Sequence, residues 1–243
     1  ILRDGETGAP LAVPTEFDGA QWFNWPNVEV DGGVTMRRRP AGMSTGPYWD
    51  FFILGRTHYE KNSQTLATDI FDDAQGLFGI SFSVGLGGST VNEFADRSKN
   101  GFEGEFALEY APEGLDFIGN TSFTRVTAKL TGYMPVYAPA PDRSDGFALY
   151  AAGFAAADYA AGRHVPLYVL TSFGGRLPHR GLGGGVRGYP KWGYEATTKA
   201  LVNAELRLVG PVLSKKLDVR PMAYVFGDAG YYGGLFKSPA AEK

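Results

Sequence analysis

Apolar and charged residues alternate along several segments of the chain with the two-residue period of a β-strand. The segments 102–110 and 124–133 show this most clearly, because each has one apolar face and one charged or polar face. A loop that contains Gly, Pro and Asn separates them, which predicts an antiparallel pair. The apolar faces are Phe102, Phe106, Leu108 and Tyr110, and Val126, Ala128 and Leu130; the opposite faces are Glu103, Glu105 and Glu109, and Arg125, Thr127, Lys129 and Thr131.

In this predicted pair, three carboxylates of one strand face two cations of the next on the same side of the sheet. Opposite charges that lie across from each other on neighbouring strands stabilise the pair. A face with so many charges needs water or polar partners. We therefore expect a sheet whose two faces meet different surroundings.

Further strands are predicted from similar or weaker alternation, and their connections are rich in Pro, Gly, Asn and Asp. The Ala-rich segment 146–162 is compatible with a helix or a strand, because Ala favours helices and short apolar runs are ambiguous. Without this segment the sequence predicts at least seven strands. The strands beyond the first pair are 27–38, 48–58, 78–86, 198–209 and 217–229.

Two all-β architectures fit such a pattern. In a soluble sandwich the apolar face is a shared core filled by large, branched side chains. Here Ala and Gly recur at apolar positions, and charges occupy the middle of the opposite face. A transmembrane barrel with lipid outside and a polar interior explains both features, and its closure leaves no strand edge unpaired. The pattern favours an antiparallel transmembrane β-barrel, with a soluble sandwich or barrel as the alternative.

Composition narrows the classes of protein that fit. The length of 243 residues suits one domain, and the formal net charge of −3 provides no basic surface for nucleic acid. The chain has no Cys, and His58, His164 and His179 are scattered, so neither residue type predicts a metal site. There is no run of about 18 apolar residues, which argues against a membrane-spanning helix. The sequence begins at Ile1 and opens with no signal-peptide pattern.

Three sequence elements follow one another in a distinctive order between residues 165 and 230. This order resembles the carboxy-terminal part of the Omp85 family, also called the bacterial surface antigen D15 family. Its members have a long loop with an Arg-Gly-Tyr/Phe tip, a strand with an Asn-x-Glu-x-Arg-like core, and a strand that ends in Phe-x-Asp-x-Gly. The resemblance covers about residues 100–235 and places the Ala-rich segment on a strand. The matching residues are Val186, Arg187, Gly188 and Tyr189, then Asn203, Glu205 and Arg207, then Phe226, Asp228 and Gly230.

The resemblance implies that a re-entrant loop, here about residues 162–195, folds back into the barrel interior. In the family, acidic side chains of the inner wall hold the loop arginine, which implies contacts from Arg187 to Glu205 and Asp228. A guanidinium is a planar fork of donors that suits two carboxylates. The alternation of residues places Glu205 and Asp228 on the polar face independently of the resemblance.

As to function, the resemblance implies insertion or translocation of proteins at a bacterial-type outer membrane. The implied partners are outer-membrane lipid, unfolded outer-membrane or secreted proteins as clients, and other subunits of a membrane complex. We expect no catalysed reaction and no cofactor. The family has POTRA domains before a barrel of about sixteen strands. This chain has no recognisable POTRA domain and too few residues for that barrel. We therefore expect a single β-barrel domain over residues 1–243 that is either incomplete at both ends or smaller and closed by something else.

Two other functions stay open. One is an accessory or passive outer-membrane barrel without assembly activity, and the other is a soluble all-β carbohydrate-active or carbohydrate-binding protein. Paired carboxylates, such as Glu103 with Glu105 or Asp72 with Asp73, would suit a glycosidase, although a charged inner wall is the favoured interpretation. The aromatic cluster 22–26 fits a sugar platform, an interfacial girdle or a packed turn.

One nucleotide-binding motif is rejected. Gly183, Gly185 and Gly188 have the spacing of a dinucleotide-binding loop. Such a loop opens a helix within a βαβ unit, whereas here Pro190 follows almost directly. We therefore expect no dinucleotide site.

Overall fold

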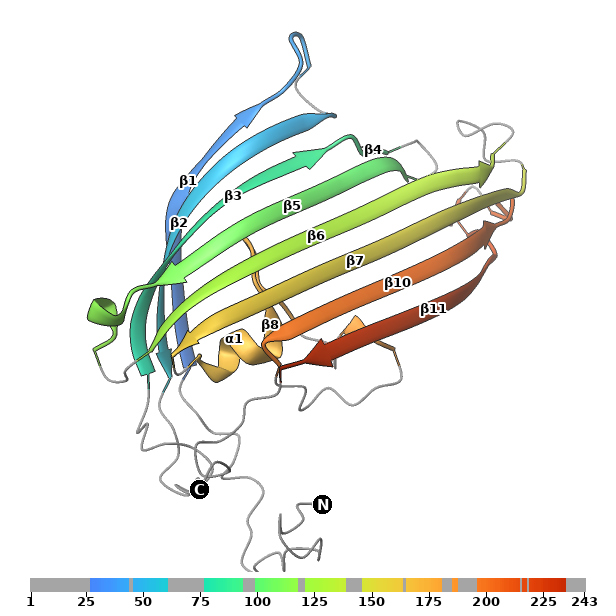
Figure 1. Ribbon diagram of the computed structural model, residues 1–243. Coiled ribbons are helices and arrows are strands. Elements are labelled where there is room, and N and C mark those ends of the chain that lie inside the picture. Colours follow the sequence, from blue (N-terminus) through green and yellow to red (C-terminus); the bar gives the residue numbers. More distant parts are fainter. Residues whose placement is uncertain are drawn as a thin grey trace, which may run out of the picture.

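The described part of the chain is all-β and is dominated by one antiparallel sheet of eight long strands (Figure 1). The computed structural model describes residues 27–43, 46–60, 77–93, 99–117, 121–138, 146–163, 165–180, 185–187, 196–214, 216–217 and 219–234. The long strands, in their order across the sheet, are β1 (Asn27–Arg38), β2 (Tyr48–Glu60), β3 (Leu77–Ser89), β5 (Lys99–Ala111), β6 (Ser122–Tyr137), β7 (Ala148–Arg163), β10 (Thr198–Val209) and β11 (Met222–Gly233).

Shorter elements lie between the long strands. The strand β4 (Asn92–Glu93) pairs with the start of β5, and a 3₁₀ turn, η2 (Glu113–Leu115), precedes β6. Between β7 and β10 the chain forms the helix α1 (Leu167–Thr171) and the small hairpin of β8 (Ser172–Phe173) and β9 (His179–Arg180). The sequence pattern did not predict these short elements.

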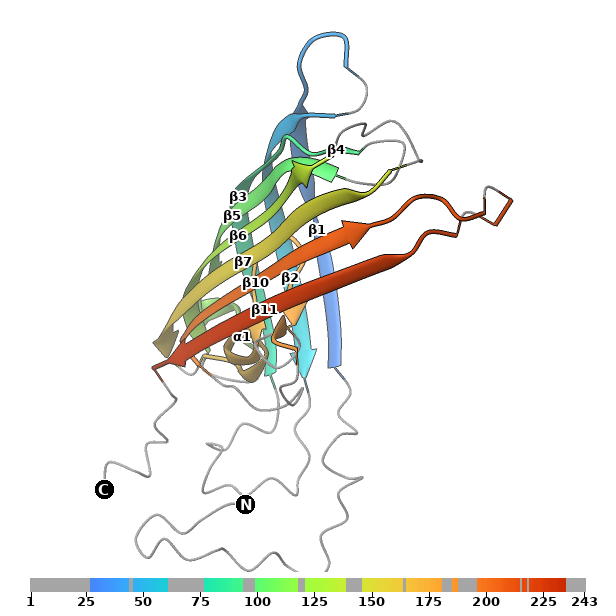
Figure 2. The same ribbon diagram turned by 90° about the vertical axis from the view of Figure 1, so that its right-hand side faces the viewer.

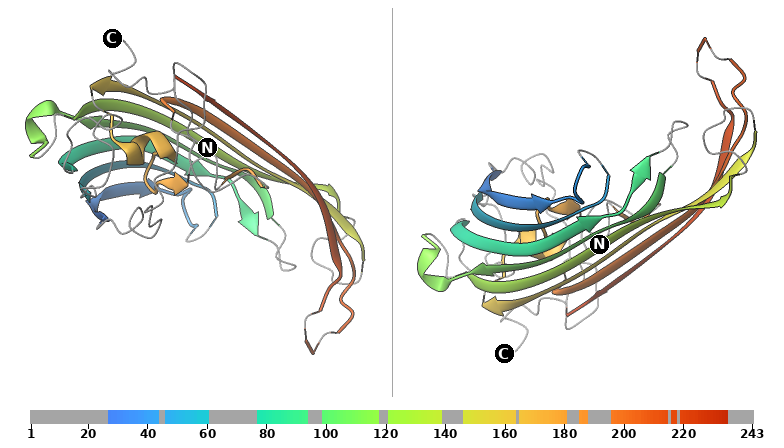
Figure 3. Two further views of the ribbon diagram at one scale, coloured as in Figure 1. Left: turned by 90° about the horizontal axis from the view of Figure 1, so that it is seen from below. Right: turned by 90° about the horizontal axis from the view of Figure 1, so that it is seen from above.

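The long strands form a meander, in which β7 pairs with β10 across the inserted segment 164–197. The sheet is strongly curved (Figure 2), and α1 and β8 lie on its concave side (Figure 3). β1 and β11 form the two edges and are not paired with each other in the described residues. The eight strands therefore make an open, curved sheet and do not by themselves close the expected barrel.

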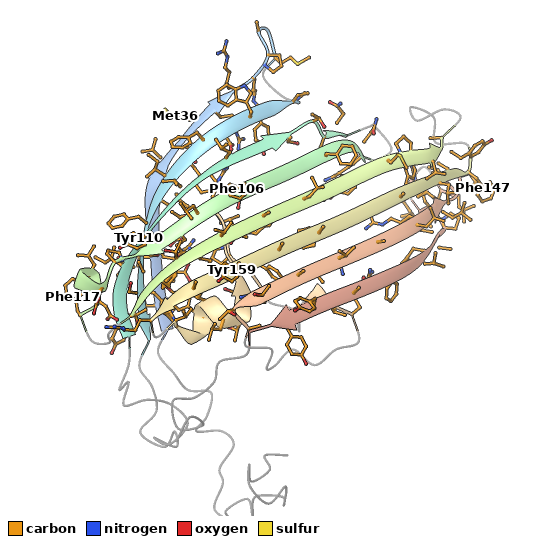
Figure 4. All side chains as sticks on the ribbon, viewed as in Figure 1. Met36, Phe106, Tyr110, Phe117, Phe147 and Tyr159 are labelled. Atoms are coloured by element: carbon orange, nitrogen blue, oxygen red, sulfur yellow. The ribbon has the colours of Figure 1, made fainter. Side chains whose placement is uncertain are left out.

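The convex face of the sheet is apolar (Figure 4). Met36, Phe106 and Tyr159 point outward from β1, β5 and β7, and each is more than half exposed. Large apolar residues therefore occupy positions where a soluble protein would expose polar ones. Others exposed on this face are Val30, Val34, Ile53, Phe82, Val84, Leu86, Phe102, Leu108, Leu130, Val202, Leu206 and Leu208.

The concave face is polar, and many of its charged side chains are buried, since the inserted segment contacts them. The predicted opposition of charges is present: Glu105 lies opposite Lys129, and Glu109 lies opposite Arg125. The nitrogen–oxygen distances are 3.8 Å and 3.9 Å. The buried charged residues are Asp50, Arg56, Glu109, Arg125, Asp158 and Lys199.

Two apolar clusters lie between the sheet and the inserted segment. Each joins side chains of the strands to side chains of residues 165–187, so the inserted segment is part of the core. One cluster comprises Ala156, Phe173, Val186 and Leu201, and the other comprises Ala111, Phe123, Ala160 and Val169.

The strand bounds agree with the predicted pattern at 27–38 and 198–209, and the Ala-rich segment is the strand β7. The prediction was wrong at the start of the last strand, which begins at Met222 rather than at residue 217. Pro221 lacks an N–H group and cannot donate to the ladder. Its carbonyl instead accepts a hydrogen bond from Gly210 N at 2.8 Å, which closes the turn before β11.

Candidate functional site

Arg187 lies on the concave side and is held by two carboxylates of neighbouring strands. Its Nε and Nη2 donate to the two oxygens of Asp228, both at 2.7 Å, and its Nη1 donates to Glu205 Oε1 at 2.5 Å. Its backbone N–H also donates to Asp228, at 2.9 Å. The structure therefore brings together the three residues that the family resemblance connects.

Strand geometry explains why these side chains meet. Asn203 of β10 lies opposite Asp228 of β11, and Glu205 lies opposite Phe226. Because side chains two residues apart share a face, both carboxylates point to the concave side. The register of one hairpin thus builds a site with two acids.

Neighbouring residues fix the guanidinium and its backbone. The Arg187 guanidinium lies 3.7 Å from the centroid of the Phe226 ring, a cation–π contact. Asn203 Nδ2 donates to Gly185 O at 2.9 Å, and Arg207 forms an ion pair with Glu205. Two other predicted positions lie near this site: Val186 is buried against Leu201 and Phe173, and Gly230 lies opposite Leu201. The predicted tip residues Gly188 and Tyr189 are outside the described residues.

Hydrogen bonds to Asp228 raise the pKa of the Arg187 guanidinium further above its usual range, and those to Glu205 add to the effect. The side chain is still 34% exposed, so water screens part of this attraction. Arg187 therefore stays charged at neutral pH. The contact gives orientation as well as attraction, because a bidentate pair is directional.

A second arginine, Arg176, attaches the inserted segment to strands nearer the β1 edge of the same concave face. Arg176 donates to the two carboxylate oxygens of Asp50 in β2, at 2.6 Å and 3.2 Å, and Asp50 also accepts from Arg37 at 2.8 Å. The backbone N–H of Arg176 donates to Glu105 at 2.8 Å. Hydrogen bonds to Asp50 raise the pKa of Arg176 above its usual value.

A buried set of charges lies beneath the start of the segment. Asp158 accepts from Arg125 Nε at 2.8 Å and from the backbone N–H of Gly174 at 3.0 Å, and it lies 3.0 Å from Lys199 Nζ. Lys199 also donates to Val169 O at 3.0 Å. Unpaired charges would be costly at this depth, so each ion of the set stabilises the burial of the others.

Arg56 links the first strands to the same segment. It donates to Asp31 at 2.9 Å, to Glu109 at 3.4 Å and to Gly175 O at 3.3 Å. Glu109 also accepts from Ser81 Oγ at 2.6 Å. The segment is therefore held from β1–β2 across to β11.

The helix α1 packs across several strands: Tyr168 contacts His58 of β2 and Phe123 of β6, and Val169 packs with Ala111, Phe123 and Ala160. The rings of Tyr168 and His58 are stacked with their centroids 3.9 Å apart, and Val169 and Leu170 are buried. Burial raises the pKa of the Tyr168 phenol well above its usual range, so the phenol stays neutral. The helix therefore contacts the sheet with an uncharged surface.

Sequence reasoning identified Arg187, Glu205 and Asp228 but missed the contacts of Arg176, Arg125 and Lys199. One available signal was Gly174-Gly175-Arg176, where two glycines allow close approach of the backbone. Another was Asp158, a single acid in an Ala-rich strand.

The other candidate residues are placed as follows. Glu105 contacts Lys129 and Arg176, and Glu103 accepts a hydrogen bond from Tyr48 at 3.3 Å. Asp72, Asp73 and the aromatic cluster 22–26 lie outside the described residues. In the described ranges, no set of three or more acidic, His or Cys side chains is arranged to hold a metal ion. The same ranges contain no helix with the length and apolarity to span a bilayer.

No protein-family model matches the chain, and no curated protein is significantly similar to it.

Proposed function

We propose that the chain forms part of a transmembrane β-barrel of the Omp85 type in a bacterial-type outer membrane. The observation that supports this most directly is the anchoring of Arg187 by Asp228 and Glu205 inside a curved sheet whose convex face is apolar. The loop with Arg187 and its glycines, the strand with Glu205 and the strand with Asp228 follow one another in the order found in the Omp85 family.

The distribution of side chains supports the membrane part of the proposal. The long strands have 12 to 16 residues, more than the roughly 9 to 11 that cross a bilayer. Exposed Phe, Leu and Val side chains on the convex face suit contact with lipid, and the charged concave face suits a polar interior.

In this proposal the chain takes part in inserting or translocating client proteins. Residues 165–180 and 185–187 are attached to the inner face, since Arg56 and Arg125 bind them and Arg176 and Arg187 bind the sheet from them. A client that enters the interior would meet this ordered, charged surface. The clients would be unfolded outer-membrane proteins or secreted proteins.

The membrane part is tested by two matched substitutions. Phe106 is 51% exposed on the convex face of β5, and Phe117 is 59% exposed beyond the end of that strand. An arginine in the lipid-facing middle of a strand costs about 2 to 4 kcal/mol, and far less near the interface. Phe106→Arg should therefore reduce assembly into phosphatidylcholine vesicles, and Phe117→Arg should not. Equal assembly of both variants would count against lipid contact at β5.

The assembly activity needs a separate experiment. The chain is folded into vesicles, an unfolded eight-stranded barrel protein is added, and its insertion is followed by the change in gel mobility of folded barrels. We expect faster insertion than into empty vesicles, and a loss of this gain in Arg187→Glu. If the client inserted no faster than it does into empty vesicles, the chain would be a passive barrel without assembly activity.

A further inference from the structure

The two edge strands each have one row of backbone groups with no strand partner among the described residues. Of the strands that the structure describes, β2 alone pairs with β1, and β10 alone pairs with β11. If the sheet spans a membrane, as proposed above, these N–H and C=O groups would face hydrocarbon, which cannot form hydrogen bonds with them. A membrane-spanning form of this sheet therefore needs a strand partner at both edges.

Closure of the sheet on itself conflicts with the inserted segment. The interior of an eight-stranded barrel is just wide enough for its own side chains. Here the concave side holds the helix α1 and the β8–β9 hairpin, and a helix alone is roughly 10 Å in diameter. Val169 and Phe173 of this segment are fully buried against the sheet. A closed barrel around this segment therefore needs more than eight strands.

A second copy of the chain fits both edges. The sheet has eight long strands in antiparallel order, so β1 and β11 run in opposite directions. A two-fold axis along the barrel would place β11 of each copy antiparallel to β1 of the other. Both edge strands have 12 residues, so neither would leave a long unpaired end.

We propose that two copies of the chain pair β1 with β11 at both seams and close a sixteen-stranded barrel. One register of this pairing keeps apolar side chains on the convex face and separates the acids of the two strands. With Val34 opposite Gly227 of the second copy, the outward residues of both strands stay outward. Asp31 then lies opposite Gly230 and not opposite another acid, and Arg37 lies opposite Tyr224.

The absence of cysteine from the chain makes this pairing directly testable. Two single-cysteine chains, Val34→Cys and Gly227→Cys, are produced together with different affinity tags, folded into vesicles and oxidised. A Cβ atom at Gly227 meets no other atom within 4 Å, so this substitution is sterically free. Opposed residues of antiparallel strands are close enough for a disulfide. Val225→Cys and Ala229→Cys replace Gly227→Cys in parallel samples to cover the neighbouring registers.

We expect a disulfide-linked species that contains both tags and has twice the 26.2 kDa mass of one chain. Leu108→Cys, on a central strand, is the control partner for Val34→Cys and should give no cross-link. A chain that carries both Val34→Cys and Gly227→Cys should also cross-link between copies. A disulfide formed only within that chain would overturn the proposal, since the sheet would then close on itself.

Failure of all three pairings in a membrane-inserted, monomeric chain would also overturn the proposal, because other strands would then fill both edges. Membrane insertion is measured on the same samples by resistance to alkaline extraction. Chains that resist extraction but do not cross-link refute only the two-copy barrel. Chains that are fully extracted refute the proposed membrane location itself.

Discussion

Asp158 and Lys199 lie opposite each other on β7 and β10, with 3.0 Å between carboxylate and ammonium group and neither side chain exposed. Arg125 approaches the same carboxylate from β6 at 2.8 Å. One acid therefore neutralises cations from both neighbouring strands. This relationship explains why a single acid interrupts the Ala-rich segment, and why the segment is a strand although Ala favours helices.

Asp158→Asn should destabilise the fold strongly. It removes the anion between Lys199 and Arg125, and leaving buried charges unpaired typically costs about 3 to 5 kcal/mol. The measurement is the free energy of unfolding in urea, with the protein folded in detergent micelles or vesicles.

Glu113→Gln is the matched control. Glu113 pairs with Arg163 at 3.4 Å, but both side chains are more than 60% exposed. Exposed ion pairs contribute from nothing to about 1 kcal/mol. If both substitutions lowered the stability equally, the buried ion set would not be a major source of stability.

Charge reversal tests whether attraction between Arg187 and the two carboxylates, Asp228 and Glu205, holds the inserted segment in place. Arg187→Glu places an acid beside Asp228 and Glu205, and Asp228→Arg places two cations together. Each single variant should increase cleavage by proteinase K at residues 185–187, and mass spectrometry identifies the cleavage sites. The double variant should recover part of the protection, since the opposite charges are restored in exchanged positions.

Arg163→Glu tests whether any reversal of charge has this effect. Arg163 is 68% exposed and lies at the end of β7, away from the site. Its reversal should leave the cleavage pattern unchanged. Unaltered protection in both single variants at Arg187 and Asp228 would show that the ion pairs do not hold the tip.

Gly175 in the inserted segment has a backbone conformation that disfavours any other residue. Gly175 has φ +100°, and a Cβ atom there would lie 2.2 Å from Glu105 Oε1 and 2.8 Å from Lys129 Nζ. The ends of these two side chains can shift, so the cost comes mainly from the left-handed backbone, and Gly175→Ala should lower the unfolding free energy by roughly 1 to 2 kcal/mol.

Gly114→Ala provides the comparison, because a Cβ atom at Gly114 meets no atom within 4 Å and no left-handed φ is involved. Its unfolding free energy should stay within about 0.5 kcal/mol of the original chain. Equal stability of the two variants would mean that residue 175 does not need a left-handed backbone in the folded protein.

The alternation of residues was sufficient to predict most of the sheet. Phe106 and Glu109 occupy the faces that their positions in the pattern assign to them, and the pairing of Glu105 with Lys129 follows from the same period. The pattern depends only on the two-residue repeat of a strand, which is a local property.

The anchoring of the inserted segment was less predictable. Arg176 and Asp50 are 126 residues apart in sequence, and no periodic pattern in the sequence connects the two positions. The helix α1 has only five residues, too few for a helical pattern to emerge. Of the cations that hold the inserted segment, Arg187 alone was predicted, because the family resemblance supplied its partners Glu205 and Asp228. The open edges at β1 and β11 follow from the order of strands in the sheet, which no local pattern predicts.

The account depends on lipid at the convex face and a polar interior at the concave one. Nitroxide labels attached to single cysteines at positions 106 to 110 of β5, in vesicles, measure this directly through their collision rates with oxygen and with a water-soluble nickel chelate. We predict alternation: positions 106, 108 and 110 meet oxygen in the bilayer, and positions 107 and 109 are shielded from it. Uniform access of the nickel chelate to 106, 108 and 110 would contradict the account.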